Sequence, residues 1–269
     1  MNPADLDFLQ TLVQGRCGLS LRGDKGYFAE SRLGGLARRE GMASVEALLE
    51  QLRQGSDERL AAATAEALAV TDTAFFRDGP TFGRLKTDVL PALAGEAAER
   101  VVQVWCAGCS TGQEAYSLAM MAEEQSPPLR LEIVATDLSE RVLEKAHSGL
   151  YTQFEVQRGL PIRLLLKYFE KAGEMWAITP RLRAAIRWRR LNLVEERRSR
   201  RQFDLILCRN VLSYFEPDLR ERVLAQFLPG LAPGGYLVLG PAEPGPQGFE
   251  AMGDGVFRQQ VQADRVVAA

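Results

Sequence analysis

This chain of 269 residues has little of several features that mark special classes of protein. Its four cysteines are too few for a disulfide framework, and we interpret them as free thiols of a reducing compartment. No run approaches the roughly 18 apolar residues of a membrane span, and the first residues are acidic where a signal peptide is basic. With 33 basic and 35 acidic residues, no excess charge directs the chain to nucleic acid or membrane. We therefore expect a soluble, cytoplasmic protein.

Metal-binding patterns are equally scarce. Cys106 and Cys109 have the spacing of a redox pair or of half a zinc site. A structural zinc ion needs four ligands, and the remaining candidates, Cys17, Cys208 and the single His147, are scattered without a second paired spacing. We expect loop thiols and no metal. His147 lies near the end of a predicted helix, where a contact with the helix dipole is its ordinary role.

The chain divides into a helical part and an α/β part. Residues 1–75 show helical spacing, as in Leu9 and Val13, with a helix start at Ser44 and an alanine-rich helix over 58–70. This predicts an all-helical N-terminal domain, followed by one domain over 76–269. After residue 100, β-branched runs alternate with helical stretches, which is typical of a parallel sheet wrapped by helices.

The predicted elements of this second domain follow in chain order. The strands are expected at 101–106, 131–136, 186–191, 203–208 and 236–239, and the helices at 113–124, 140–147 and 218–227. Residues 149–185 form an insert with a short strand at 176–178, and the glycine- and proline-rich stretch 241–253 is expected to be a loop.

In an open α/β sheet the ligand binds beyond the carboxyl ends of the strands. The loop after the first strand, 106–114, is built of small residues but matches neither G-x-G-x-x-G nor a P-loop. The next helix opens with Gln113 and Glu114, whose carboxylate repels a pyrophosphate and suits a cationic ligand. Asp137 ends the second strand, where an acid typically binds ribose hydroxyls. A ribose with a cationic group indicates S-adenosylmethionine, although an acid at this place is about as often a helix N-cap.

Longer motifs carry a family resemblance. Residues 104–120, VWCAGCSTGQEAYSLAM, resemble the signature loop of the chemotaxis receptor methyltransferases, the CheR family. TDTAFFR at 71–77, ATDLS at 135–139 with Gly149-Leu150-Tyr151, FDLILCRNVLSYF at 203–215 and LAPGGYL at 231–237 resemble further segments of the family in the same order. The resemblance covers nearly the whole chain.

The resemblance implies a fold and a site. It implies an N-terminal helical bundle followed by a Rossmann-like, class I S-adenosylmethionine-dependent methyltransferase domain, with 149–185 as a small β-subdomain. Tyr214 and Arg77 are implied to act on the methyl-accepting group. The implied cofactor-binding residues are Thr71, Thr73, Arg77, Glu114, Asp137, Asn192, Leu193, Arg209 and Asn210.

The implied reaction is methyl transfer to glutamate side chains of chemoreceptors in chemotactic signal transduction. A glutamate carboxylate is already ionised at neutral pH, so no general base is required, and positioning can supply roughly 7–11 kcal/mol. The implied partner is the cytoplasmic helical domain of a chemoreceptor. The turn at 170–174 is short, whereas members that grip a receptor's tail peptide have a longer loop there, so we expect no such tether.

Two arginine groups are candidate docking surfaces for acidic receptor helices. One is Arg32, Arg38 and Arg39 in a single predicted helix, and the other comprises the nine arginines between residues 181 and 201. A solvated face is the more common meaning of such runs. RNA binding is the rival for the second group, but the balanced net charge and the lack of interleaved aromatics argue against it.

Departures from the family pattern keep alternatives open. Thr71, Gln113 and Ala115 stand where the family usually has Asn, Glu and Pro, and LGPAE at 239–243 replaces a Gly-His-Ser-Glu ending. A non-catalytic adaptor that senses the cofactor is therefore one alternative. A nucleotide-dependent oxidoreductase is another, which the acid at 114 disfavours.

Overall fold

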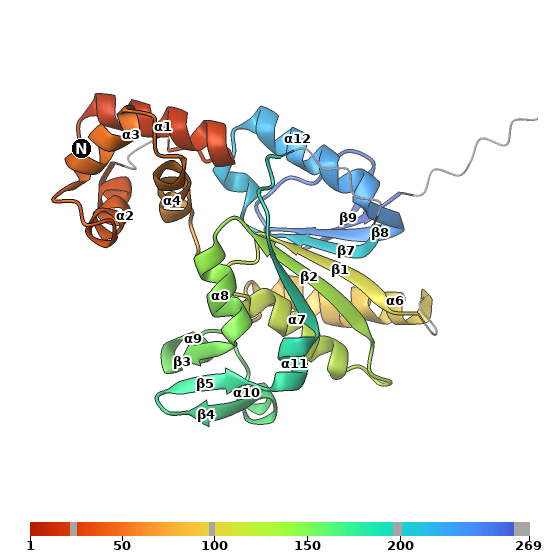
Figure 1. The fold of residues 1–269 in the computed structure, drawn as a ribbon. Coiled ribbons are helices and arrows are strands. Elements are labelled where there is room, and N and C mark those ends of the chain that lie inside the picture. The colour runs from red at the N-terminus through yellow and green to blue at the C-terminus, as the bar shows by residue number, and fades with distance from the viewer. Residues whose placement is uncertain (22–25, 97–99, 196–200, 261–269) are drawn as a thin grey trace, which may run out of the picture.

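The computed structural model describes residues 1–21, 26–96, 100–195 and 201–260. It has a helical domain, an α/β domain and a three-stranded insert (Figure 1). The helical domain and the insert lie on the same side of the α/β domain, with α8 between them (Figure 1). No helix in the described ranges is long and apolar enough to span a membrane.

The helical domain is formed by α1 (Pro3–Cys17), α2 (Gly26–Arg39), α3 (Val45–Arg53) and α4 (Glu58–Leu68). Side chains cap three of these helices: Asn2 accepts from the Asp5 amide at 2.9 Å, Ser44 from Ala47 at 3.3 Å and Asp57 from Leu60 at 2.8 Å. Their apolar faces bury a separate core, and the helical spacing that predicted it is confirmed. This core includes Leu9, Val13, Leu33, Leu36, Leu48 and Leu60.

A nearly continuous helical stretch leads into the α/β domain. It runs through α5 (Gly79–Arg84), the π-helical turn η1 (Leu85–Val89) and α6 (Leu90–Glu96). These helices were not among the elements predicted from the sequence. They bury Phe82, Leu85, Val89 and Leu90 in the main core beside the sheet.

The main sheet has seven strands in the order β6-β2-β1-β7-β8-β10-β9. The first five strands of that order are parallel, and the last two run antiparallel to their neighbours. The helix α12 (Pro217–Phe227) covers one face, while α6 and α7 (Gln113–Glu123) cover the other (Figure 1). The chain steps from β1 to β2 on one side and reaches β7 on the other, so the order reverses beside β1. The strands are β1 (Val102–Ala107), β2 (Leu131–Asp137), β6 (Ile186–Arg190), β7 (Phe203–Cys208), β8 (Leu231–Leu239), β9 (Phe249–Gly253) and β10 (Val256–Gln259).

The insert follows α8 (Glu140–Ser148) and returns to the sheet at β6. Its small sheet has the order β3-β5-β4, and Gly173 and Glu174 alone connect β4 to β5. Outside the insert, in the sheet domain, the short 3₁₀ turns η2 (Leu212–Tyr214) and η3 (Leu228–Gly230) flank α12. The insert's elements are β3 (Leu150–Thr152), α9 (Gln153–Gln157), α10 (Ile162–Tyr168), β4 (Phe169–Ala172), β5 (Met175–Ile178) and α11 (Pro180–Ala184).

The predicted strands and helices of the sheet domain are confirmed, most within one or two residues at each end. One prediction is wrong: residues 241–253 are not a loop throughout, because β9 begins at Phe249 and pairs with β10. The predicted final strand, 236–239, also begins earlier, at Leu231. The sheet is consequently mixed rather than purely parallel.

Candidate active site

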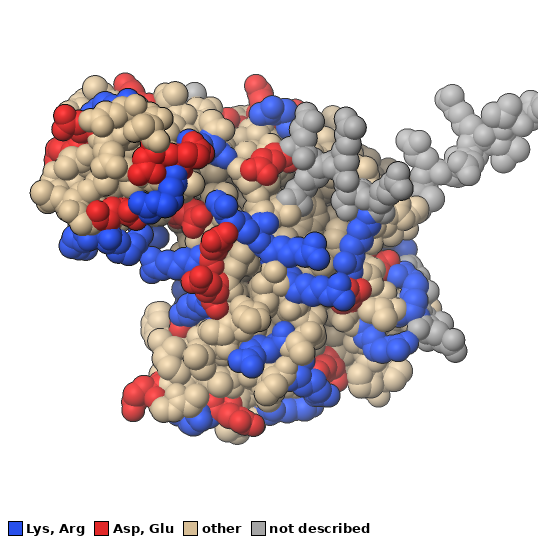
Figure 2. Space-filling model, in the orientation of Figure 1, with Lys and Arg blue, Asp and Glu red and all other residues tan. Residues whose placement is uncertain are grey.

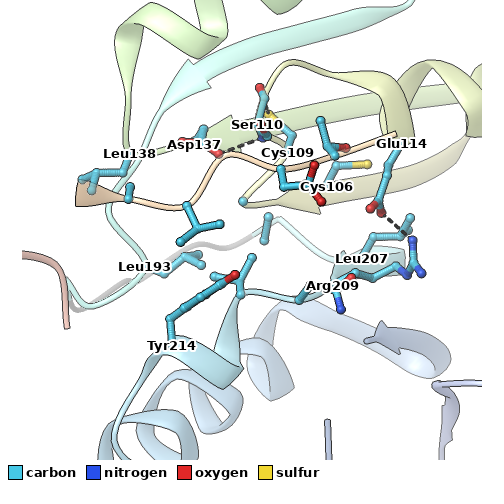
Figure 3. A pocket seen from close by; sticks show the side chains of 18 of the residues that line it. Cys106, Cys109, Ser110, Glu114, Asp137, Leu138, Leu193, Leu207, Arg209 and Tyr214 are labelled. Atoms are coloured by element: carbon cyan, nitrogen blue, oxygen red, sulfur yellow. Dashed lines mark hydrogen bonds and ion pairs between the residues drawn. The ribbon is translucent and has the colours of Figure 1, made fainter. Parts of the chain in front are cut away.

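A cavity lies at the carboxyl ends of β1, β2 and β7, where the strand order reverses. Figure 3 shows Asp137 at one end of the cavity, the pair Glu114 and Arg209 at the other, and Tyr214 on the wall between them. The cavity thus has a carboxylate at each end.

The loop after β1 forms one wall. Gly108 is left-handed with φ +72°, and a Cβ there would lie 2.5 Å from Cγ2 of Val211, so only glycine lets the two loops approach. Both cysteines of this wall, Cys106 and Cys109, are buried free thiols, and burial raises the pKa of each. A thiol held protonated is a poor nucleophile and metal ligand.

Asp137 ends β2 and is oriented by two backbone amides. Its Oδ2 accepts from the Ser110 amide at 2.8 Å, and its Oδ1 accepts from the Ser139 amide at 3.1 Å. Burial raises the pKa of this carboxyl, and these hydrogen bonds oppose that effect. The free lone pairs of Asp137 are therefore the acceptors available to a ligand at this end.

Glu114 belongs to a buried chain of charges at the other end. Its Oε2 lies 2.9 Å from Nη1 of Arg209, whose Nη2 donates to Asp78 at 2.7 Å. The Arg209 side chain is fully buried, and its guanidinium carbon lies 5.4 Å from the centroid of the Phe82 ring. Burial raises the pKa of Glu114, and the nearby Arg209 charge opposes that effect. Two carboxylates share the Arg209 guanidinium here, and the nearby Arg77 charge also acts on Glu114.

The loop after β7 carries Asn210 and Tyr214 to the cavity. Asn210 is left-handed with φ +56°, and its Oδ1 is buried without a hydrogen-bond partner among the described residues. Tyr214 ends η2, and its hydroxyl points toward the cavity (Figure 3). This loop therefore presents an unused acceptor and a phenol to whatever occupies the cavity.

The helical domain closes the cavity from outside the sheet domain. Leu19 lines the cavity and forms a β-bridge with Phe215, while the Ser20 amide donates to the Tyr214 carbonyl at 2.9 Å. The Ser20 hydroxyl also donates to Glu216 at 2.7 Å. These contacts hold the Tyr214 loop against the end of α1.

The segment between α4 and α5 contributes Arg77. Its Nη1 donates to the Asp72 carbonyl at 2.8 Å, and its side chain lines the cavity together with Thr73. The neighbours Phe76 and Asp78 are left-handed, with φ +50° and +57°. These turns bring Arg77 and Asp78 into the same region as Glu114 and Arg209.

Most of the residues implied by the resemblance meet in this one cavity. They are Thr73, Arg77, Glu114, Asp137, Asn192, Leu193, Arg209, Asn210 and Tyr214. Thr71 does not line it: it borders a neighbouring groove, and its carbonyl accepts from the Ser110 hydroxyl at 2.8 Å. Gln113 and Ala115 are buried in α7 and do not line the cavity either. The departures from the family pattern at these three positions therefore lie outside the cavity wall.

Several residues of the site were not predicted from the sequence. Leu19 and Cys17 come from the helical domain, and no local pattern connects them to a strand end. Asp78 was also missed, although an acid directly after Arg77 in a quoted motif is a visible signal. Asn192 lines the cavity, and its Nδ2 donates to the Arg16 carbonyl of α1 at 2.6 Å.

These polar groups fit S-adenosylmethionine. S-adenosylmethionine has ribose hydroxyls at one end and an ammonium group at the other, and both need acceptors, which the carboxylates of Asp137 and Glu114 provide. The orphaned Oδ1 of Asn210 is a further unused acceptor on the wall between them.

Arginines gather on the face beside this cavity. A band of Lys and Arg crosses the face along which the edge strand β6 runs (Figures 1 and 2). Arg187 and Arg190 pair with Glu132 and Glu66, at 3.1 and 3.3 Å, and Arg189 is exposed. Arg197, Arg198 and Arg200 of the predicted arginine group lie outside the described residues.

The fold and the cavity define a class of protein, the S-adenosylmethionine-dependent methyltransferases, and family models agree. Residues 71–252 match the SAM binding domain of CheR methyltransferases, and residues 4–65 match the all-alpha domain of the same family. The chain therefore belongs to the CheR methyltransferase family.

Curated relatives that align with most of this chain are described as chemotaxis protein methyltransferases. Chemotaxis protein methyltransferase 1 of Pseudomonas aeruginosa is 35% identical over 89% of this chain and 90% of its own. Cher2 of Pseudomonas putida is 33% identical over 90% and 92%, and chemotaxis protein methyltransferase 1 of Vibrio cholerae is 35% identical over 88% and 87%.

Proposed function

We propose that this chain methylates glutamate side chains of chemoreceptors, with S-adenosylmethionine bound between Asp137 and the Glu114 cluster. The observation that carries the proposal is the pair of buried carboxylates at the two ends of one cavity. In this assignment Asp137 accepts from the ribose hydroxyls, and Glu114 and Asn210 accept from the ammonium end. Asn192 and Leu193 line the adenine side, and Arg77 and Arg209 face the cofactor's carboxylate.

The reaction needs alignment rather than proton transfer. When bound, the cofactor supplies an electrophilic methyl group on sulfur: the S–C bond breaks, a C–O bond to the glutamate carboxylate forms, and a neutral thioether leaves. No proton moves, which agrees with a cavity whose lining contains no histidine among the described residues. Tyr214 donates a hydrogen bond that orients the acceptor carboxylate, and Arg77 holds it near the methyl group without a buried bidentate pair.

The partner assigned to this site is the cytoplasmic helical domain of a chemoreceptor, so we place the enzyme in the cytoplasm. Acidic methylation helices suit the basic surfaces, Arg32, Arg38 and Arg39 on α2 and the exposed arginines of β6. The two-residue turn between β4 and β5 leaves no long loop to grip a receptor tail, so no tail tether is assigned.

The test uses the full chain, methyl-labelled S-adenosylmethionine and receptor-containing membranes. We expect protein-bound label that mild base releases as methanol, because a carboxyl methyl ester is base-labile. Tight binding of S-adenosylhomocysteine without label on any receptor would instead favour the sensing adaptor. Binding of NAD in place of S-adenosylhomocysteine would favour an oxidoreductase.

The role of Tyr214 is tested by Tyr214→Phe in the same assay. Loss of one orienting hydrogen bond should lower kcat about 10- to 100-fold while S-adenosylhomocysteine affinity stays near wild type. A variant that methylates at the wild-type rate removes Tyr214 from the mechanism.

A further inference from the structure

Glu243 is a buried carboxylate that the proposed reaction does not use. It lies in the turn after β8, only 6% exposed, and joins no ion pair within the described ranges. Its Oε2 accepts from the amides of Gly240 at 2.6 Å and Asn210 at 3.0 Å, and its Oε1 accepts from the Ser213 amide at 3.0 Å. Burying a carboxylate is unfavourable unless such donors replace its hydration, so these three amides define its place.

Two of the three donors belong to the loop that carries Asn210 and Tyr214. Asn210 has the left-handed φ of +56°, which asparagine tolerates better than other residues with a side chain, and its amide in this conformation donates to Glu243. Ser213 lies within η2, directly before Tyr214. One carboxylate thus binds the loop at Asn210 and directly before Tyr214, and the side chains of both residues line the cavity.

The turn that carries Glu243 is shaped for this contact. A Cβ on Gly240 would lie 2.8 Å from Nδ2 of Asn210 and 2.9 Å from Oε2 of Glu243. A side chain at position 240 would therefore push the carboxylate and the loop apart. Glycine is required here by close approach, and not by a positive φ.

We propose that Glu243 is a positioning residue for methyl transfer, because its carboxylate holds the Asn210 and Tyr214 loop in the shape that faces cofactor and acceptor together. The proposal rests on the proposed function of the cavity. Glu243 does not line the cavity, so it acts through the loop. Its effect should appear mainly in kcat, since the loop's misplacement disturbs alignment more than binding.

The first variant is Glu243→Gln in the full chain. The amide has one acceptor oxygen and places an NH₂ group against backbone N–H donors, so at least one of the three bonds is lost. At saturating cofactor and receptor we expect kcat to fall about 10- to 100-fold, and the Kd for S-adenosylhomocysteine to rise as well, by about two- to tenfold.

Asp204 provides the matched control. It is equally buried, 5% exposed, and its Oδ2 accepts from the Gln103 amide at 2.8 Å and from Arg100 at 2.7 Å. It lies near the amino end of β7, opposite the cavity end of the same strand. Asp204→Asn should lower the melting temperature at least as much as Glu243→Gln and leave kcat unchanged below the unfolding transition.

A Glu243→Gln protein that loses stability but keeps wild-type kcat overturns the proposal. If that variant does not fold, Gly240→Ala tests the proposal instead. It displaces the Glu243 carboxylate without removing it, so it should lower kcat in the same way. If the wild-type chain methylates no receptor, the proposed function fails on its own. In that case an unchanged Kd for S-adenosylhomocysteine in Glu243→Gln separately overturns the role of Glu243 in placing Asn210.

Discussion

The helical domain and the insert are both appended to one side of the sheet domain, but they meet the cavity differently. The helical domain supplies part of the cavity wall through Cys17 and Leu19 and hydrogen-bonds to the Tyr214 loop. No residue of β3 through α11 lines the cavity, but Tyr151 donates to the Thr111 carbonyl at 2.7 Å and Arg158 pairs with Asp72, a lining residue, at 2.6 Å. The helical domain thus supplies part of the cavity wall, whereas the insert only contacts residues of that wall.

The largest effect that this difference predicts is that of Gly18→Ala. Gly18 is left-handed with φ +75°, and a Cβ there would lie 2.2 Å from Cδ2 of Leu219 in α12. Strain and overlap together should lower the free energy of unfolding by about 2–4 kcal/mol. Displacing the helical domain should also reduce kcat more than about tenfold. Chemical denaturation and the methylation assay measure the two effects.

The matched control is Gly41→Ala. Gly41 has nearly the same conformation, φ +71°, but nothing lies within 4 Å of its Cβ position. The cost should be about 1 kcal/mol, with kcat unchanged. Equal losses of kcat in the two variants would contradict the view that the end of α1 forms part of the active site.

A smaller effect is expected from Ser20→Ala. It removes the 2.7 Å hydrogen bond to Glu216 but leaves the backbone bond from Ser20 to Tyr214. Loss of one hydrogen bond to a charged group should cost about 1–2 kcal/mol and lower kcat a few-fold. Thr11→Ala is the control, because the Thr11 hydroxyl bonds only within α1, to the Asp7 carbonyl at 3.0 Å. Matching kcat values for the two variants would show that the hydrogen bond from Ser20 to Glu216 does not position the Tyr214 loop.

The smallest effect on catalysis is expected from Glu124→Gln, at the contact between the end of α7 and the insert. Glu124 of the α7 end accepts from Lys167 at 2.5 Å, from Tyr168 at 2.9 Å and from Arg163, all in α10. These donors lower the pKa of Glu124 to about 2. The variant should lower the melting temperature by about 2–4 °C at neutral pH without changing kcat.

The stabilisation by Glu124 should depend on pH in a defined direction. A carboxyl whose pKa is lowered by folding stabilises the fold above its ordinary pKa of 4.5, and this contribution is lost as the pH falls toward about 2. The difference in melting temperature between wild type and Glu124→Gln should therefore shrink across that window. A difference that is constant with pH would show that the ion pairs do not stabilise the insert. Glu123→Gln, which removes one exposed pair with Arg181, should have less effect.

The sequence predicted the parts of the molecule that depend on local pattern. All six residues of β7 are buried, and apart from Asp204 the strand is an apolar run with clear ends. Glu114 lies in the helix that follows β1 and Asp137 ends β2, and parallel strands bring such positions to one edge. Arg209 came from the motif resemblance. The motif resemblance added Arg77 and Tyr214.

Long-range contacts account for what the sequence did not predict. The strand β9 follows a glycine- and proline-rich stretch, and its pairing with β10 rather than its own composition makes it a strand. Leu19 reaches the cavity only because α1 docks beside α12. The role of Glu243 is set by amides 30 and 33 residues away, which no local spacing reveals.

The contact between Ser20 and Tyr214 is made by main-chain atoms, with glycine at position 18. Such a contact does not depend on which side chains the rest of the helical domain carries. The basic face assigned to the receptor lies on α2, whereas the contact with the Tyr214 loop comes from the end of α1. We therefore expect the domain to behave as an exchangeable module: replacing the exposed side chains of α2 with those of a relative should alter receptor choice, while the contact at the end of α1 keeps Tyr214 in place.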